Sequence, residues 1–216
     1  MLTRSPSAIQ LAHLSDPIVK ELAALGQVRN FPRNTIIITE GDVSDSVYVI
    51  LSGRVRVYVS NAEGTEMILD SHGPGEYIGE IAFDSQPRSA SVITIEPTVC
   101  SIISRADFRQ AIVRNPDIAL QLIATLISRT RSATDNVKRL ALLDVYGRVV
   151  QLLIKQAVEH EGQLVVREKL TQQDIASRVG ASRDMVSRVL KDLVSGGYIS
   201  IAQKIITIHR TPPTRW

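Results

Sequence analysis

The sequence predicts an α+β protein: an N-terminal antiparallel β-roll of the jelly-roll type, then a long helix, then a C-terminal winged helix-turn-helix domain. The first observation behind this prediction is a series of short apolar segments between residues 28 and 104, which Gly and Pro separate. The second is a coiled-coil-like apolar pattern from residue 116 to residue 143. The third is a pair of short helical segments around Gly180, followed by a hairpin pattern.

The expected roll is built from short strands with glycines at the turns. This arrangement favours an antiparallel barrel or roll over alternating strands and helices, and such a roll can hold a pocket. The segments expected to form strands are "TIIIT", "SVYVILSG", "RVRVYVS", "EMILDS", "ASVITIE" and "TVCSIIS". The glycines expected at the turns are Gly41, Gly53, Gly64, Gly73 and Gly75.

Capping residues mark where helices begin. Ser104 is expected to cap a helix, with Asp107 three residues later as in a capping box. Pro116 then begins the long helix, and Asp144 can cap the helix after it. We therefore expect residues 1–115, 116–143 and 144–216 to form three functional segments.

The long helix carries an apolar face in alternating steps of four and three residues. Its members are Ile123, Ile127, Thr130, Thr134, Val137 and Ala141. This face either packs on the roll or pairs with a twin helix in a coiled coil. A second stripe is available to pack on the roll, namely Leu122, Leu126 and Leu140. We therefore expect the first face to form a parallel homodimer.

Residues 171–193 have the pattern of a helix-turn-helix. The first helix is expected over residues 172–179 and the turn at Gly180, with Ser182 capping the second helix. "YISIAQKIITIH" then predicts a β-hairpin, or wing. Three polar residues share a face near the start of the second helix: Arg183, Asp184 and Arg188.

The charge distribution favours an acidic partner for the C-terminal part. Residues 144–216 hold 11 Lys and Arg against 7 Asp and Glu, whereas residues 1–143 hold 14 against 15. A basic surplus around a helix pair makes double-stranded DNA the expected partner.

Composition excludes several classes. Hydrophobic residues make up 44% of the chain and charged residues 22%, as in ordinary globular proteins, and no segment is long and apolar enough to span a membrane. We expect a cytoplasmic protein without a membrane partner. The single Cys100 is expected in a buried strand, and the four His show no metal-ligand spacing, so we expect surface His and no metal.

"GEIAFDSQPRSAS" places Glu80 and Arg88 in an apolar, strand-forming region. The two residues can form an ion pair that closes a loop, or they can bind a ligand. A catalytic role is a weaker reading because no nucleophile or metal cluster accompanies them, so we do not expect an enzyme.

Three motifs, in order, resemble the CRP/FNR family of bacterial transcription regulators. "YIGEIAFDSQPRSASV" is similar to the phosphate-binding cassette of cyclic-nucleotide domains, and "LALLDVYGRV" to the family's hinge. "TQQDIASRVGASRDMVSRVLKDL" is similar to its helix-turn-helix. The resemblance implies a homodimeric, allosteric regulator that binds DNA and contacts RNA polymerase.

The resemblance also implies a cyclic-nucleotide site. Gly79 would begin a one-turn helix facing the phosphate, Glu80 would bind the ribose 2′-OH, and Arg88 with Ser89 would bind the phosphodiester. Without ligand, Glu80 and Arg88 would pair with each other. The full ligand-binding set implied is Gly79, Glu80, Ile81, Ala82, Arg88, Ser89 and Thr134.

The sequence constrains the identity of the nucleotide less than it constrains the presence of a nucleotide site. Relatives that respond to cyclic AMP commonly present Thr-Ser to the adenine, whereas this chain has Ala133-Thr134. Cyclic AMP is the first expectation, with cyclic GMP, cyclic di-GMP or no small ligand as alternatives. A haem sensor would need an axial ligand such as His72, and a protein of another class would bind or hydrolyse the nucleotide without a DNA role.

By resemblance, the DNA target is a palindrome with TGTGA-like half-sites. Arg183 and Arg188 can each pair with guanine, and Asp184, where the family usually has Glu, can accept from cytosine. Arg178 and Lys191 are expected to contact phosphates. The DNA-binding set is Thr171, Gln172, Ser182, Arg183, Asp184, Ser187, Arg188 and Lys191.

Overall fold

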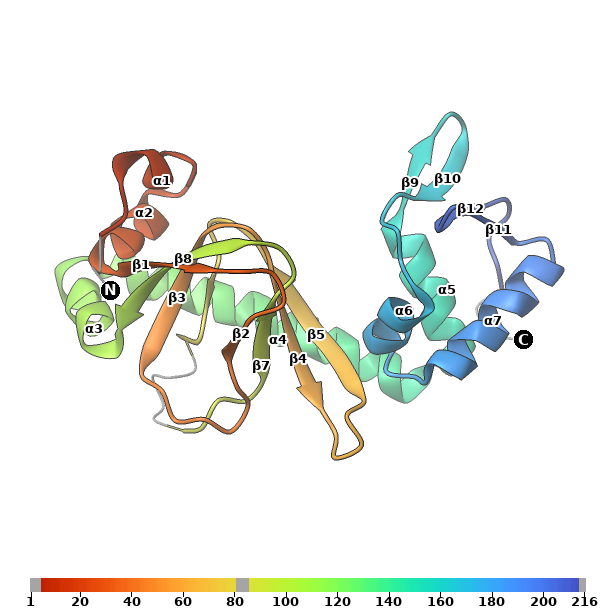
Figure 1. The fold of residues 1–216 in the computed structure, drawn as a ribbon, viewed down its shortest axis with the longest axis horizontal. Coiled ribbons are helices and arrows are strands. Elements are labelled where there is room, and N and C mark those ends of the chain that lie inside the picture. The colour runs from red at the N-terminus through yellow and green to blue at the C-terminus, as the bar shows by residue number, and fades with distance from the viewer. Residues whose placement is uncertain (1–4, 81–85, 214–216) are drawn as a thin grey trace. The chain divides into compact units, whose positions relative to one another are not determined.

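The computed structural model describes residues 5–80 and 86–213 of the 216-residue chain. The chain folds into two compact units with separate cores. The first unit comprises Met1–Val59 and Leu69–Arg129, and the second comprises Ser60–Ile68 and Thr130–Trp216. Figure 1 shows that strands dominate the first unit, whereas helices and two hairpins make up most of the second.

Two short helices, α1 (Ala8–Ala12) and α2 (Pro17–Leu25), precede the strands and were not predicted from the sequence. Local capping explains why they form. Ser7 makes a capping box at the start of α1. At the start of α2, Asp16 Oδ1 accepts a 2.8 Å hydrogen bond from the backbone N–H of Ile18.

The described part of the first unit contains two four-stranded sheets. Their strands are β1 (Gln27–Phe31), β2 (Ile36–Ile38), β3 (Ser46–Ser52), β4 (Val55–Ser60), β5 (Glu66–His72), β6 (Tyr77–Ile78), β7 (Ser91–Thr94) and β8 (Thr98–Ser104). The sheet orders are β1-β8-β3-β6 and β2-β7-β4-β5. The pairs β1–β8, β3–β8, β3–β6, β2–β7 and β4–β7 are antiparallel, which confirms the predicted roll. Strands β1 and β6 were not among the predicted segments.

One core forms where the residues of β3 and β8 that face the helices meet helix α3 (Arg105–Arg114). A second core joins the two sheets and contains Ile50, Val92 and Cys100. Val47, Ile103 and Phe108 have no exposed surface. Fully burying side chains of this kind contributes roughly 1.5–3 kcal/mol each. Cys100 is buried in β8 as predicted, and burial raises the pKa of its thiol to about 12.

Helix α4 (Asp117–Leu142) leaves the predicted coiled-coil face largely uncovered. Its large apolar members, each at least half exposed, are Ile123, Ile127 and Val137. From the second stripe, Leu122 packs against the core that β3 and β8 form with α3, whereas Leu126 and Leu140 are 39% and 40% exposed. The expectation that this stripe packs on the roll is therefore confirmed for Leu122 and stays a prediction for the other two.

The second unit contains the predicted winged helix-turn-helix domain. Its elements after α4 are α5 (Val145–Gln156), β9 (Ala157–His160), β10 (Gln163–Val166), α6 (Gln172–Val179), α7 (Arg183–Ser195), β11 (Ile199–Ala202) and β12 (Ile205–Ile208). The strands form one sheet in the order β11-β12-β10-β9. One buried core joins Val149 of α5, Ile175 of α6, Leu193 of α7 and Ile206 of β12. The wing hairpin and the helix pair are thus one packed body.

The predicted helix caps are confirmed. In each case a side-chain oxygen accepts a hydrogen bond from the backbone N–H three residues later. The distance is 3.1 Å for Ser104 at α3, 2.7 Å for Asp144 at α5 and 3.2 Å for Ser182 at α7. These residues therefore fix where the helices begin.

Candidate functional site

The chain turns at Gly79, directly after β6. Its φ of +83° lies in the left-handed region that favours glycine. A Cβ at this position would lie 2.8 Å from Arg88 Nη1 and 2.9 Å from the carbonyl oxygen of Ser46. Glycine is thus required both by the backbone conformation and by the close approach of Arg88. The rest of the implied one-turn helix, with Ile81 and Ala82, lies outside the described residues.

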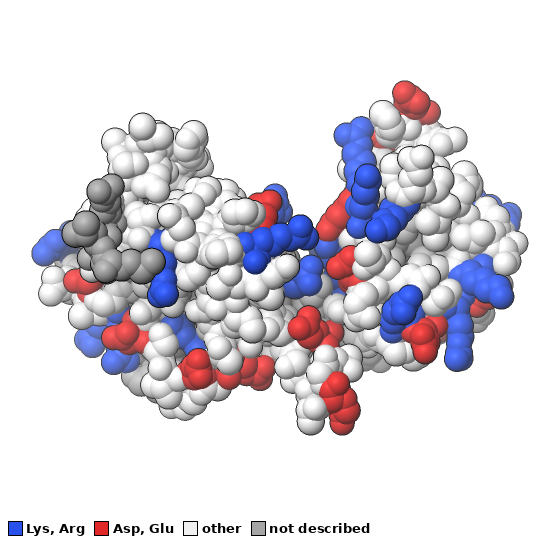
Figure 2. Space-filling model, viewed as in Figure 1, with Lys and Arg blue, Asp and Glu red and all other residues white. Residues whose placement is uncertain are grey.

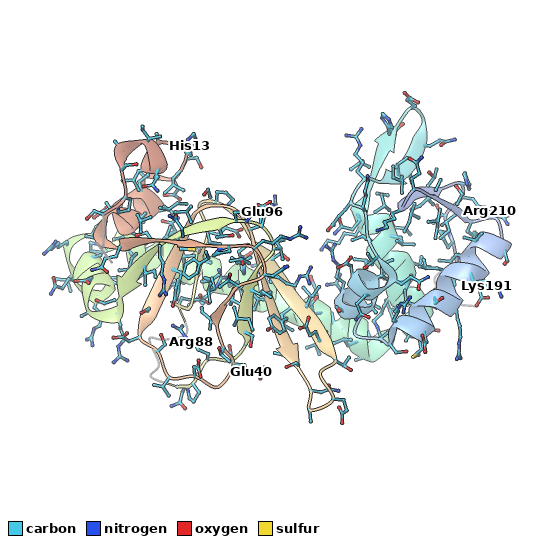
Figure 3. The ribbon with its side chains drawn as sticks, in the orientation of Figure 1. His13, Glu40, Arg88, Glu96, Lys191 and Arg210 are labelled. Atoms are coloured by element: carbon cyan, nitrogen blue, oxygen red, sulfur yellow. The ribbon has the colours of Figure 1, made fainter. Side chains whose placement is uncertain are left out.

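Arg88 is a buried cation, with 4% of its surface exposed (Figure 3). Its guanidinium donates to the Gly79 carbonyl at 2.7 Å, the Ser46 carbonyl at 2.6 Å and Ser44 Oγ at 3.0 Å. Its Nε is buried and has no hydrogen-bond partner among the residues that the structure describes. Burial lowers the pKa of Arg88 from its ordinary value. A held guanidinium with an unused donor can bind an anion such as a phosphate.

Glu80 is also buried, at 7% exposure, and its partner is Arg129 of α4. Glu80 Oε1 lies 2.5 Å from Arg129 Nη1. Arg129 also donates to the carbonyl of Tyr77 at 2.5 Å and lies over the Tyr77 ring, 5.7 Å from its centroid. The expectation that Glu80 pairs with Arg88 in the empty protein is therefore wrong, because the cation from α4 takes that place.

Arg129 was not among the predicted site residues. In the sequence it is one of several Arg residues on a long helix, where arginines usually face solvent. Its role becomes visible only because the fold brings α4 next to the segment that carries Glu80. A buried carboxylate requires a cation nearby. That requirement of Glu80 was the one signal in the sequence that could have pointed to an arginine such as Arg129.

The other predicted ligand-binding residues in the described part of the chain are exposed, unlike Gly79, Glu80 and Arg88. Ser89 is exposed, next to the buried Arg88. Thr134 lies in the second unit, is exposed, and donates its hydroxyl proton to the carbonyl of Thr130 at 2.9 Å. The structure thus groups Gly79, Glu80 and Arg88, while the contacts expected of Ser89 and Thr134 stay predictions.

His72 is buried at 5% exposure, so the prediction of surface positions is wrong for this His. Its Nδ1 lies 3.2 Å from Glu76 Oε1, and its Nε2 lies 3.7 Å from Asp70 Oδ2. The exposed His are His13, His160 and His209.

Within residues 5–80 and 86–213, no cluster of His, Cys, Asp or Glu suits a metal ion. No helix of that part has the length and apolar character of a membrane span.

The helix pair of the second unit is held by local hydrogen bonds. Thr171 caps α6 in a capping box, accepting from the N–H of Asp174 at 3.1 Å. Gly180 ends α6 in the left-handed conformation, with φ of +63°. This is the glycine turn that a helix-turn-helix uses between its helices.

Helix α7 presents a polar face opposite a buried one. Val186, Leu190 and Leu193 are buried. The exposed residues on the other side are Arg183, Asp184, Arg188 and Lys191. Figure 3 labels Lys191 on α7, and Figure 2 shows several groups of Lys and Arg side chains on the second unit. Gln172 and Ser187 are half-buried, and the caps Thr171 and Ser182 are exposed.

Two further arginines of this unit bind protein groups. Arg178, which we expected at phosphates, forms an ion pair with Glu168 through both of its terminal nitrogens. Arg148 of α5 donates to the Leu143 carbonyl at 2.9 Å, just after α4, and to the Val179 carbonyl at 2.8 Å, at the end of α6. Arg148 therefore ties the predicted hinge to the helix-turn-helix.

Comparison with known families identifies both halves of the chain. Residues 28–115 match the family model of the cyclic nucleotide-binding domain. Residues 147–212 match the model of the Crp-like helix-turn-helix domain. The first match contains the segment with Gly79, Glu80 and Arg88, and the second contains α6, α7 and the wing.

Relatives match over most of their length. The cAMP-activated global transcriptional regulator CRP of Escherichia coli is 32% identical, with 91% of this chain and 96% of the relative covered. A CRP-like cAMP-activated global transcriptional regulator of Mycobacterium tuberculosis is 35% identical, with 83% and 82% covered.

Among solved structures, the c-di-GMP-responsive global regulator CLP of Xanthomonas campestris is similar. It matches with a TM-score of 0.79 at 27% identity, with 90% of this chain and 99% of that chain covered. The relatives are transcription regulators rather than enzymes. With both domains matched and 32–35% identity over most of its length, the chain belongs to the CRP/FNR family of DNA-binding transcription regulators.

Proposed function

We propose that the protein is a homodimeric transcription regulator whose affinity for DNA is set by a cyclic nucleotide, with cyclic AMP as the effector. The observation that carries this proposal is the buried Arg88, close to the buried carboxylate of Glu80, with no partner for its Nε within residues 5–80 and 86–213. Such a pair suits a ligand with an anionic phosphodiester and a neighbouring hydroxyl.

Each ligand group has a proposed contact. The phosphodiester binds Arg88 and Ser89, with the backbone from Gly79 through Ala82, and the ribose 2′-OH donates to Glu80. Thr134 supplies a hydroxyl to the base. Cyclic AMP is favoured because relatives at 32% and 35% identity are cAMP-activated. Cyclic GMP and cyclic di-GMP are the alternatives, the latter because a structural relative responds to c-di-GMP.

The proposed dimer uses the exposed apolar face of α4. Ile123, Ile127 and Val137 are each at least half exposed in the single chain, and their spacing suits a coiled coil. In this proposal residues 1–115 sense the nucleotide, 116–143 dimerise, and 144–216 bind DNA. RNA polymerase is the further partner, and the cytoplasm of a bacterial cell is the proposed location.

The proposed DNA target is a palindrome with TGTGA-like half-sites. The dimer presents two copies of α7 to successive major grooves. The base contacts are assigned to Arg183, Asp184 and Arg188. Backbone contacts are assigned to Thr171, Gln172, Ser182, Ser187 and Lys191.

Calorimetric titration with cyclic AMP, cyclic GMP and cyclic di-GMP tests the effector. Arg88→Ala should abolish binding in a folded dimer, since loss of a buried charge-assisted contact costs roughly 2 to 5 kcal/mol. Arg109→Ala, at an exposed position of α3, is the matched control and should bind as wild type does. Unchanged affinity in folded Arg88→Ala would refute the site. Nucleotide turnover would instead favour a hydrolase.

A further inference from the structure

One covered face of helix α4 is polar rather than apolar. Gln121, Thr125 and Arg129 lie four residues apart, so they share a face of the helix. Between residues 123 and 130 of this described helix, Thr125 and Arg129 are the two that are not exposed. Gln121 Nε2 donates to Asp16 Oδ2, at the start of α2, at 2.6 Å. Polar groups therefore attach this part of α4 to the rest of the first unit.

Tyr77 of β6 lies against this polar face. Arg129 donates to the Tyr77 carbonyl at 2.5 Å, and its guanidinium lies 5.7 Å from the centroid of the Tyr77 ring. Burial is the main cause that raises the pKa of Tyr77, and the other groups that shift it belong to Thr125, Arg129, Glu80 and Asp16. These groups surround one buried side chain, which is 4% exposed.

Two buried polar atoms at this contact have no hydrogen-bond partner within residues 5–80 and 86–213. They are Tyr77 Oη and Gln121 Oε1. Thr125 lies near the Tyr77 hydroxyl, but its own hydroxyl donates to the Gln121 carbonyl at 3.0 Å. A buried hydroxyl and a buried amide oxygen are costly to leave unpaired. A water molecule that accepts from Tyr77 and donates to Gln121 would satisfy both atoms.

Tyr77 lies three residues before Glu80, and the backbone restrains this segment weakly. Strand β6 has two residues and lies at the edge of its sheet, next to β3. Side-chain contacts with α4 supply further restraint. Arg129 makes two of them, because it bonds both the Tyr77 carbonyl and the Glu80 carboxylate. The position of Glu80 therefore depends on how α4 presents Arg129.

We propose that Tyr77 is a positioning residue for ribose recognition: a buried water joins its hydroxyl to Gln121 Oε1, and this link fixes the turn of α4 from which Arg129 holds Glu80. The proposal rests on the proposed nucleotide site and adds two residues that do not touch the ligand. A fully satisfied buried polar network holds its members in one arrangement. Loss of the link should loosen Glu80 and weaken its hydrogen bond to the 2′-OH, while the phosphate contacts of Arg88 are unaffected.

The preference for a ribose over a deoxyribose measures this effect. Calorimetric titration compares cyclic AMP with 2′-deoxy cyclic AMP on the full-length protein, and thermal unfolding without ligand measures stability. Tyr77→Phe removes only the hydroxyl. Gln121→Met removes the amide and keeps a side chain of similar length. Tyr58→Phe is the matched control, since Tyr58 is a buried tyrosine of β4 in the same unit.

Wild type should bind cyclic AMP about tenfold more tightly than its 2′-deoxy form, because Glu80 accepts from the 2′-OH. In Tyr77→Phe this preference should fall to about threefold through weaker binding of cyclic AMP, with unchanged affinity for the 2′-deoxy form. The thermal midpoint of the first unit should fall by about 4 °C, because the water loses a partner. Gln121→Met should act in the same way, and the double variant should lose no more preference than either single one. Tyr58→Phe should keep the wild-type preference.

The results that would overturn the proposal are distinguishable. An unchanged or raised midpoint in Tyr77→Phe would show that the hydroxyl has no partner in solution. A lower midpoint with an unchanged preference for cyclic AMP would show that Tyr77 affects stability alone. A wild type that binds both ligands equally would overturn the contact between Glu80 and the ribose, and the positioning role with it. A wild type that binds neither ligand would overturn the proposed nucleotide site itself.

Discussion

Arg129 of α4 and Glu80 of the segment after β6 form an ion pair, with 2.5 Å between Nη1 and Oε1. The Glu80 side chain is 7% exposed and the Arg129 side chain 23% exposed. The carboxylate that we assign to the ribose is thus held in place by the helix that we assign to the dimer. Any displacement of Arg129 must change the environment of Glu80, because the buried carboxylate needs a cation.

Replacing Arg129 tests this link. Arg129→Ala leaves the Glu80 carboxylate buried without its cation, so the free energy of unfolding should fall by about 3 kcal/mol. Urea unfolding measures the change, and Arg131→Ala, at an exposed position two residues further along α4, is the control. The double variant Arg129→Ala with Glu80→Gln should recover most of the loss. If the double variant is as unstable as the single one, the ion pair is not the cause.

Arg148 provides a second test, at the hinge. Arg148→Ala removes donors from the carbonyls of Leu143 and Val179, and each lost bond should destabilise the second unit by roughly 1 kcal/mol. We expect a lower thermal midpoint of this unit and a smaller effect of nucleotide on operator affinity. Lys155→Ala, at an exposed position of α5, is the control. An unchanged ratio of affinities with and without nucleotide would show that Arg148 does not transmit the signal.

Elements with strong local signals could be predicted from the sequence. The caps Ser104, Asp144 and Ser182 follow from residue type and position, and the glycine turn at Gly180 follows from the break between two apolar helical patterns. The roll was predicted because its strands are short, apolar and bounded by turn residues. The two-residue strand β6 has too few residues to show such a pattern.

Contacts between distant segments could not be predicted in the same way. Arg129 and Glu80 are far apart in the sequence, and only the packing of α4 on the roll brings them together. His72 was expected at the surface because no sequence pattern indicated that β5 buries its last residue. Arg178 was assigned to phosphates from its position alone, and its partner Glu168 lies in the loop before α6.

The pair of Glu76 and His72 makes stability depend on pH. The hydrogen bond from His72 is the main cause that lowers the pKa of Glu76 below its ordinary 4.5. At a pH between the pKa of Glu76 in the folded chain and its higher pKa in the unfolded chain, the unfolded chain binds more protons than the folded one. The stabilisation is therefore present above about pH 4.5 and is lost as pH falls through the folded pKa. In Glu76→Gln, the free energy of unfolding should therefore fall less steeply between pH 5 and pH 3.

Urea unfolding at a series of pH values measures this dependence. Glu40→Gln removes an exposed carboxylate from the same unit and is the matched control (Figure 3). It should reproduce the wild-type pH profile. If Glu76→Gln and wild type lose stability in parallel below pH 5, the hydrogen bond to His72 does not contribute in solution.

Selection of binding sites from random DNA tests the base contacts of α7. Arg183→Ala or Arg188→Ala should each weaken the free energy of binding to the preferred operator by roughly 1 to 3 kcal/mol. Each should also remove the preference for guanine at one base position, because a guanidinium donates to guanine O6 and N7 together. Lys191→Ala is the matched control, since loss of a phosphate contact should weaken binding to all sequences alike and lower the salt slope by about 0.9 for each protomer. Asp184→Glu should strengthen the preference for cytosine at the base that Asp184 contacts, because the longer side chain reaches cytosine N4 directly. Identical preferred sequences from wild type and Arg188→Ala would show that α7 does not read bases through this residue.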